Sequence, residues 1–153
     1  MPAVLWIDNE PLSFDKPLRR LLRQDDICLE NRLSVGEAID YLEECGDDLP
    51  KCIILDAILP LGGFAGSLEA LEHPDTGGTV SESMRRLAQS CTGRLVLDRF
   101  PVVGSRTIVF SVAPGEKLKE VGFPADIPKF FLKKEFTRRK LEMKEAIMEL
   151  AKK

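Results

Sequence analysis

Side chains that could hold a metal or another cation stand at the ends of several short apolar runs in this sequence. Asp8 and Asn9 end the first of these runs, Asp56 ends a central one, and Ser111 and Lys134 follow the last two. Burying a carboxylate costs free energy unless it is paired, so such an aspartate normally lies at a rim or beside a cation. Two carboxylates, a hydroxyl and an ammonium would form a site if the fold brought these run ends together.

The central run is the strongest signal. Residues 52–55 are all apolar, Asp56 follows directly, and Pro60 stands four positions later. A continuous apolar run of this length is typical of a strand buried on both faces of a parallel sheet. Open α/β folds keep their binding sites at the carboxyl ends of such strands. The sequence therefore predicts Asp56 at the functional edge of a parallel sheet.

The rest of the chain alternates between helix and strand signals. Apolar periodicity and capping residues predict helices over about 12–24, 34–46, 81–90, 92–100, 114–121 and 136–152, and apolar runs predict strands over 4–7, 27–29, 52–55, 107–110 and 129–132. This alternation predicts an α/β domain with a five-stranded parallel sheet and helices on both faces. All strand ends that carry the polar residues would then share one edge.

Composition sets the remaining bounds. A chain of 153 residues fits a single domain spanning 1–153. The net charge of −3 argues against a nucleic-acid partner, because phosphate binding needs a basic excess. The four cysteines lack metal spacing, and no run is long enough to span a membrane, so we expect a cytoplasmic protein without a membrane partner.

Taken together, the motifs resemble those of the receiver domain of bacterial two-component response regulators. Residues 4–11 are similar to the family's first strand and acidic pocket, and residues 55–60 to its phosphoacceptor segment with the proline four after the aspartate. Residues 108–111 resemble its fourth strand, and residues 131–136 its aromatic-x-x-Lys-Pro-Phe segment. The resemblance implies a flavodoxin-like, doubly wound sheet of strand order 2-1-3-4-5.

The resemblance also implies a function and a role for each site residue. The chain would be a single-domain response regulator that accepts a phosphoryl group on Asp56 from a histidine kinase, a phosphotransfer protein or a small phosphodonor. Lys134 would pair with the phosphate, Ser111 would bond one of its oxygens, and Phe131 would turn inward on activation. The metal would be Mg²⁺ or Mn²⁺, held by Asp8, Asn9, Asp56 and the carbonyl of Ile58.

The resemblance further implies how such a domain signals. A downstream protein partner, or a second copy in a homodimer, would dock on the face formed by the fourth helix, the fifth strand and the last helix, including Phe131 and residues 136–152. Any hydrolysis of its own acyl phosphate would be a side activity, so the chain is not expected to be a conventional enzyme.

Several departures from the family pattern keep a second hypothesis open. Asn9 replaces an acid unless Glu10 substitutes for it, Val112 stands where a small residue is usual, and Glu135 replaces the proline. A phosphorylation-independent interaction module (a pseudo-receiver) could use as its partner surface an insertion at about 61–92, or the face formed by the fourth helix, the fifth strand and the last helix. The insertion would precede a helix at Thr92-Gly93, or follow one that begins at Gly77-Gly78.

A third hypothesis is a metal-dependent phosphatase with an aspartate nucleophile. That class expects a second aspartate two positions after the nucleophile, where this chain has Ile58. We therefore rank it below the other two.

Overall fold

The computed structural model describes residues 2–9, 14–23, 27–72 and 81–152. Its centre is one sheet whose strands are β1 (Pro2–Ile7), β2 (Cys28–Arg32), β3 (Cys52–Leu55), β4 (Thr107–Ser111) and β5 (Lys129–Leu132). The strands are parallel and lie in the order β2-β1-β3-β4-β5. The predicted fold class and strand order are confirmed.

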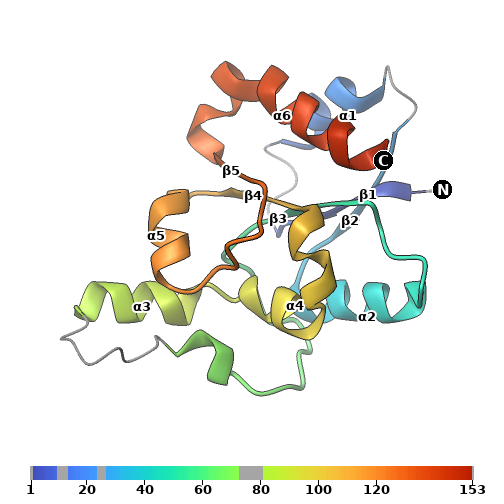
Figure 1. Ribbon diagram of the computed structural model, residues 1–153. Helices are drawn as coiled ribbons and strands as arrows, with labels where there is room; N and C mark the ends of the chain where they lie inside the picture. The colour runs from blue at the N-terminus through green and yellow to red at the C-terminus, as the bar shows by residue number, and fades with distance from the viewer. Residues whose placement is uncertain (1, 10–13, 24–26, 73–80, 153) are drawn as a thin grey trace.

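One face of the sheet is covered by α1 (Asp15–Arg23) and α6 (Phe136–Ala151), which Figure 1 shows together on one side. Alternate strand residues such as Trp6, Ile54 and Phe110 point into this layer, where they form a core cluster with the apolar sides of both helices. Pro17 lies in the first turn of α1, where its missing amide hydrogen costs nothing. This cluster contains most of the buried aromatic side chains near the site.

The opposite face is covered by α2 (Val35–Cys45), α4 (Arg94–Arg99) and α5 (Gly115–Glu120). The other set of alternate strand residues, including Leu5, Ile53 and Val109, packs against them in a second core cluster. Ser34 caps α2 by accepting a 3.1 Å hydrogen bond from the Glu37 amide, as the capping-box pattern predicts.

Between β3 and α4 the chain makes a long excursion. It includes the short helix η2 (Glu69–Leu71) and the helix α3 (Glu82–Ser90), and a further short helix η3 (Pro101–Arg106) follows α4. Residues 73–80, like Glu10, lie outside the described residues. Within the described ranges, no helix combines the length and the apolar composition needed to cross a bilayer.

The place of the excursion relative to the sheet distinguishes the two registers considered from the sequence. The Thr92 hydroxyl accepts a 2.8 Å bond from the Leu59 amide, and the Gly93 amide donates to the Ala57 carbonyl at 2.9 Å. The helix that begins after Thr92-Gly93 therefore lies against the segment that follows β3. The described residues of the excursion, 61–72 and 81–91, precede this helix.

Candidate functional site

Asp8 and Asp56 lie side by side at the carboxyl edge of the sheet. Ile7 pairs with Leu55 in the β1–β3 ladder, and the Asp56 amide continues it by donating to the Ile7 carbonyl at 2.9 Å. Asp8 and Asp56 each stand two residues after a strand residue that faces α1 and α6, so both lie on that face of the sheet. Asp8 is fully buried and Asp56 is 5% exposed. Two buried carboxylates therefore occupy neighbouring strand ends on the same face.

The cation that joins these carboxylates is Lys133. Its Nζ lies 2.8 Å from Asp56 Oδ2 and 2.9 Å from Asp8 Oδ2. The side chain is itself only 8% exposed, and its Nζ lies 5.9 Å from the ring centres of Phe14 and Phe110. A buried ammonium between two carboxylates offsets their charge and fixes their relative position.

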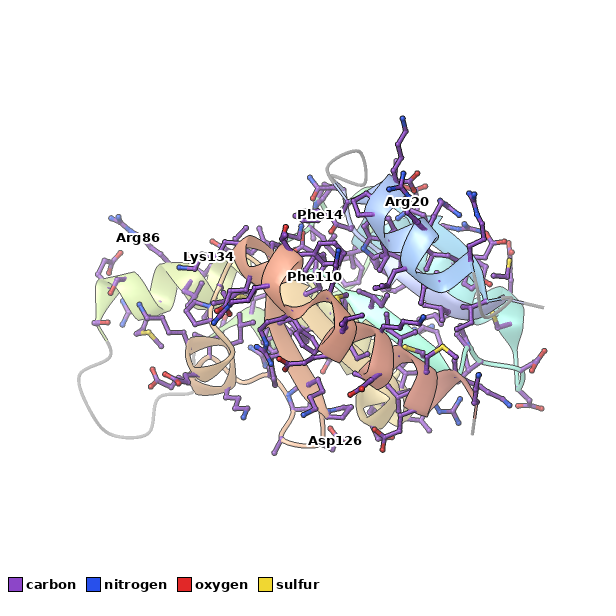
Figure 2. The ribbon with its side chains drawn as sticks, turned by 90° about the horizontal axis from the view of Figure 1, so that it is seen from above. Phe14, Arg20, Arg86, Phe110, Asp126 and Lys134 are labelled. Atoms are coloured by element: carbon purple, nitrogen blue, oxygen red, sulfur yellow. The ribbon has the colours of Figure 1, made fainter. Side chains whose placement is uncertain are left out.

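The lysine predicted from the sequence, Lys134, is not the one that enters the site. Lys134 is exposed, and Figure 2 shows it near the start of α6, apart from Phe14 and Phe110. The physical reason is that side chains alternate between the two faces of a strand. Lys133 is therefore on the same face as Phe131 and Asp56, whereas Lys134 is on the face of Leu132. The lysine beside the carboxylates is therefore the residue immediately before the predicted one.

The same shift of one residue affects the aromatic position. Phe131, predicted to turn inward on activation, is 4% exposed in the layer under α1 and α6, and the guanidinium of Arg139 lies 4.7 Å from its ring centre. Phe130 stands three positions before Lys133 and is only partly buried, on the opposite face. There its ring lies 5.2 Å from the ammonium of Lys119 on α5.

Ser111 ends β4, beside the strand that carries Asp56. It is fully buried, and its Oγ accepts a 3.3 Å hydrogen bond from the Ala113 amide. Because strand side chains alternate, Ser111 lies on the same face of β4 as Val109, which packs toward α4 and α5. Within the described part of the chain it makes no hydrogen bond to Asp56 or Lys133. Of the four predicted residues, the structure thus joins Asp8 and Asp56, places Ser111 on the adjacent strand and replaces Lys134.

The turn after Asp56 is held in place by hydrogen bonds at both of its ends. The Ile58 amide donates to Asp56 Oδ1 at 3.1 Å, next to the bonds from Thr92 and Gly93 described above. On the other side, the Val35 amide donates to the Pro60 carbonyl at 3.0 Å. The turn is therefore attached to the beginnings of both α2 and α4.

Two glycines show how closely these elements approach. A Cβ on Gly93 would lie 2.5 Å from the Asp56 carbonyl oxygen, and a Cβ on Gly36 would lie 2.1 Å from the Gly62 carbonyl oxygen. Neither distance is tolerated between real atoms, so a side chain at either position would displace the turn. Sequence reasoning missed both residues, although the Thr-Gly pair before a helix was a usable signal.

Burial and charge act in opposite directions on the ionisable groups. Burial raises the pKa of Asp56 above its ordinary value, although the Lys133 ammonium partly opposes this. Burial would by itself lower the pKa of Lys133, but the carboxylates of Asp56 and Asp8 outweigh it and raise that pKa. Lys133 is therefore charged at neutral pH.

The oxygen atoms at this edge of the sheet are potential ligands for a divalent cation. Asp8 Oδ2 and Asp56 Oδ2 both lie within hydrogen-bond distance of one nitrogen, so they are close enough to share one small cation. Carboxylate oxygens suit Mg²⁺ or Mn²⁺. Asn9, next to Asp8, is exposed, and the described ranges contain no cluster of three acidic, histidine or cysteine side chains. The carboxylate pair fits such an ion with few protein ligands.

Comparison with known proteins identifies the fold. No family model and no curated sequence matches the chain. A response regulator receiver domain protein (CheY-like) from Methanospirillum hungatei superposes with a TM-score of 0.60 at 15% identity, covering 99% of this chain and 98% of that one.

Two further solved structures agree. The signal receiver domain of a putative Luxo repressor protein from Vibrio parahaemolyticus gives a TM-score of 0.56 at 18% identity, covering 99% and 92% of the two chains. A two-component response regulator from Legionella pneumophila gives 0.54 at 16% identity, covering 97% and 99%. The protein has the fold of the response regulator receiver domain over nearly its whole length, as the sequence motifs suggested.

Proposed function

We propose that this protein is a receiver that accepts a phosphoryl group on Asp56, in the cytoplasm, and signals by docking a protein partner. The observation that supports this most directly is the pairing of Asp8, Asp56 and Lys133 at the carboxyl edge of the sheet. An acceptor carboxylate needs positive charge near it, because it must approach a phosphorus centre surrounded by anionic oxygens.

The chemistry uses the residues as follows. A carboxylate oxygen of Asp56 attacks phosphorus, the new O–P bond forms, and the bond from phosphorus to the donor's leaving group breaks. Lys133 lies where its ammonium can move from the carboxylates to a phosphate oxygen. Ser111, on the adjacent strand, would supply a hydroxyl to another oxygen after a rotation about its Cα–Cβ bond.

A divalent cation would complete this site. Asp8 and Asp56 would hold Mg²⁺ or Mn²⁺, with Asn9 and the Ile58 carbonyl as further oxygen ligands. When bound, the ion would offset charge on the phosphoryl oxygens. The protein's own contribution is to hold both carboxylates on rigid strand ends.

The test is intact mass spectrometry after incubation with Mg²⁺ and acetyl phosphate. We expect one phosphoryl adduct on the native protein and none on Asp56→Asn. The matched control is Asp47→Asn, which removes an exposed aspartate on the loop after α2 and should leave the adduct unchanged. An adduct that survives Asp56→Asn, or no adduct on folded protein that binds Mg²⁺, would contradict the proposal.

A second candidate is a receiver-fold interaction module that works without phosphorylation. It is favoured by the burial of Asp56 at 5% exposure and by an ammonium that already occupies the space between the carboxylates. Asn9 in place of an acid points the same way. A histidine kinase or phosphotransfer partner belongs to the first candidate only, whereas both candidates require a downstream protein partner.

Metal binding separates the two candidates. Trp6 is fully buried in β1, two residues before Asp8, so its fluorescence should report a cation bound at the carboxylate pair. Saturable quenching by Mg²⁺ that disappears in Asp8→Asn would favour the phosphoacceptor. An unchanged spectrum, together with no phosphoryl adduct, would favour the interaction module.

A further inference from the structure

A cavity of about 450 Å³ lies on the side of the molecule away from α1 and α6. Its walls are one side of α2, one side of α4 and residues 63–67, which belong to the excursion after β3. The size is within the range of roughly 300–1,000 Å³ that is usual for ligand-binding cavities. The segment after β3 therefore closes one side of the cavity.

The walls combine apolar surface with negative charge. Ile39, Phe64 and Leu95 supply the apolar part, and Asp40 and Asp98 are exposed acidic residues of α2 and α4. Within the described ranges, neither of these two aspartates has a cationic side chain within ion-pair distance.

A guanidinium already lies in this wall. Arg99 Nη2 is 2.8 Å from Glu43 Oε1, and both residues line the cavity. This pair uses one acid and leaves two others facing the same space. An acid on this wall thus already pairs with a guanidinium, and a second guanidinium could pack on an aromatic ring such as that of Phe64.

Negative charge continues beyond the cavity. The α2 helix carries four acidic side chains and no basic one, and residues 61–72 add two more acids. Leu68 is 48% exposed immediately after the lining residue Ser67. An extended partner with several positive charges matches this surface better than a single small cation does.

The cavity is connected to the acceptor turn. The Gly36 amide donates to the Leu61 carbonyl at 2.9 Å, and Gly36 and Gly63 both line the cavity. On the other wall, α4 begins directly after Gly93, whose amide is bonded to the Ala57 carbonyl. Both walls are thus attached to the segment that positions Asp56.

We propose that this cavity is a docking site for a basic segment of a partner protein, which inserts an arginine side chain between α2 and α4. The guanidinium would lie near Asp40 and Asp98, and the methylene groups of the same arginine would contact Ile39 and Leu95. Basic residues on either side of this arginine would lie along α2. The inference goes beyond phosphoryl transfer, because it uses none of the residues of the carboxylate site.

The test is an NMR titration of the unphosphorylated protein with two short peptides. One is acetyl-Ser-Arg-Leu-Arg-Ser-amide, and the other replaces both arginines by citrulline, which has nearly the same shape but no charge. We expect the arginine peptide to shift the amide signals of Gly63, Ala65 and Ser67 in a saturable way and the citrulline peptide to bind at least about tenfold more weakly.

Variants and a single-residue probe complete the test. Asp40→Asn with Asp98→Asn should weaken the arginine peptide about tenfold, whereas the matched Glu116→Gln with Glu120→Gln on α5 should change its affinity less than twofold. N-acetyl-arginine amide should bind more weakly than the peptide.

Three outcomes would overturn the proposal. Equal binding of the arginine and citrulline peptides would exclude a charge-reading cavity, and shifts spread over all acidic surfaces would exclude a defined site. If N-acetyl-arginine amide bound as tightly as the peptide, the cavity would be a small-molecule site instead. None of these results depends on whether Asp56 accepts a phosphoryl group.

Discussion

The two faces of the sheet differ in both core and exterior. The α1–α6 face has an aromatic core, in which the rings of Phe14, Phe110 and Phe136 have centres 5.1–5.7 Å apart. The face under α2 and α4 has a mainly aliphatic core and the cavity. Their charges are opposite as well: α1 carries four basic residues and one acid, whereas α2 carries four acids and no basic residue.

This difference shows how one sheet can separate two tasks. We call the α1–α6 face the aromatic side and the face under α2 and α4 the acidic side. Because strand residues alternate between faces, Lys133 and Asp56 belong to the aromatic side, whereas the turn after Asp56 reaches the acidic side. The aromatic side supplies a rigid, dry setting for the charged residues. The acidic side carries the cavity that we propose as a docking site, so variants on the two sides test the two proposals separately.

The largest expected effect is on the aromatic side. Lys133→Met keeps a similar chain against Phe14 and Phe110 but removes the charge, leaving Asp8 and Asp56 buried without their shared cation. We expect the free energy of unfolding at pH 7.5 to fall by about 3–5 kcal/mol, and phosphoryl transfer to be lost. Urea denaturation followed by Trp6 fluorescence measures the first effect.

Lys134→Met is the matched control for this prediction. Because Lys134 is exposed, its replacement should change the free energy of unfolding by no more than about 0.5 kcal/mol and leave the phosphoryl adduct intact. If the two variants behaved in the opposite way, the lysine assignment would have to return to Lys134.

An intermediate effect is expected from one buried thiol on each face. Burial raises the pKa of Cys52, on the aromatic side, to about 12 and that of Cys91, on the acidic side, to about 11. Both folded-state pKa values lie above the unfolded one, so the stability they contribute is complete below pH 9 and is lost as pH rises toward these values. Between pH 9 and the pKa of each folded thiol, we expect the free energy of unfolding to fall by about 1.4 kcal/mol per pH unit for that thiol.

Urea denaturation at pH 8 and pH 10 measures this loss, and Cys52→Ala with Cys91→Ala should flatten the difference. Thiol labelling at pH 8 then compares the two faces directly. We expect Cys28, which is exposed, to react first, and Cys91 to react faster than Cys52 because shorter helices cover it. Faster labelling of Cys52 would show that the aromatic side opens first.

The smallest effect on stability is expected at the cavity. Arg99 and Glu43 form an exposed ion pair, so Arg99→Ala should change the free energy of unfolding by less than about 0.5 kcal/mol. The same change frees Glu43 and should tighten binding of the arginine peptide. Weaker binding would mean that Arg99 itself contacts the partner.

The fold was predictable because its signals are local and repeated. Each of these signals specifies an element without reference to distant parts of the chain. Examples are the apolar run at residues 52–55, the N-cap of α2 at Ser34 and its C-cap at Gly46. The carboxylate pair was also predictable, since parallel strands must end at one edge. Asp8 and Asp56 follow from that rule alone.

The sequence could not show which of the two lysines lies beside the carboxylates, because the motif has two adjacent aromatic residues followed by two adjacent lysines. Phe130-Phe131 precedes Lys133-Lys134, so an aromatic-x-x-Lys spacing fits either pair. Only the side of the sheet on which Phe131 packs distinguishes them, and that depends on contacts with α6. The cavity could not be predicted either, because it depends on how residues 63–67 lie over two helices.

The hydrogen bonds that hold the turn after Asp56 have a consequence for the length of the chain. The segment between Gly62 and Thr92 begins and ends beside one short turn, because Pro60 and Leu61 are bonded to the start of α2, and Thr92 and Gly93 are bonded to Leu59 and Ala57. A loop whose ends are already fixed close together can lengthen at little entropic cost, since each doubling adds only about 0.6 kcal/mol. A change in the length of this segment should therefore cost little loop entropy, provided that Leu71, Ala88 and Cys91 keep their places in the core.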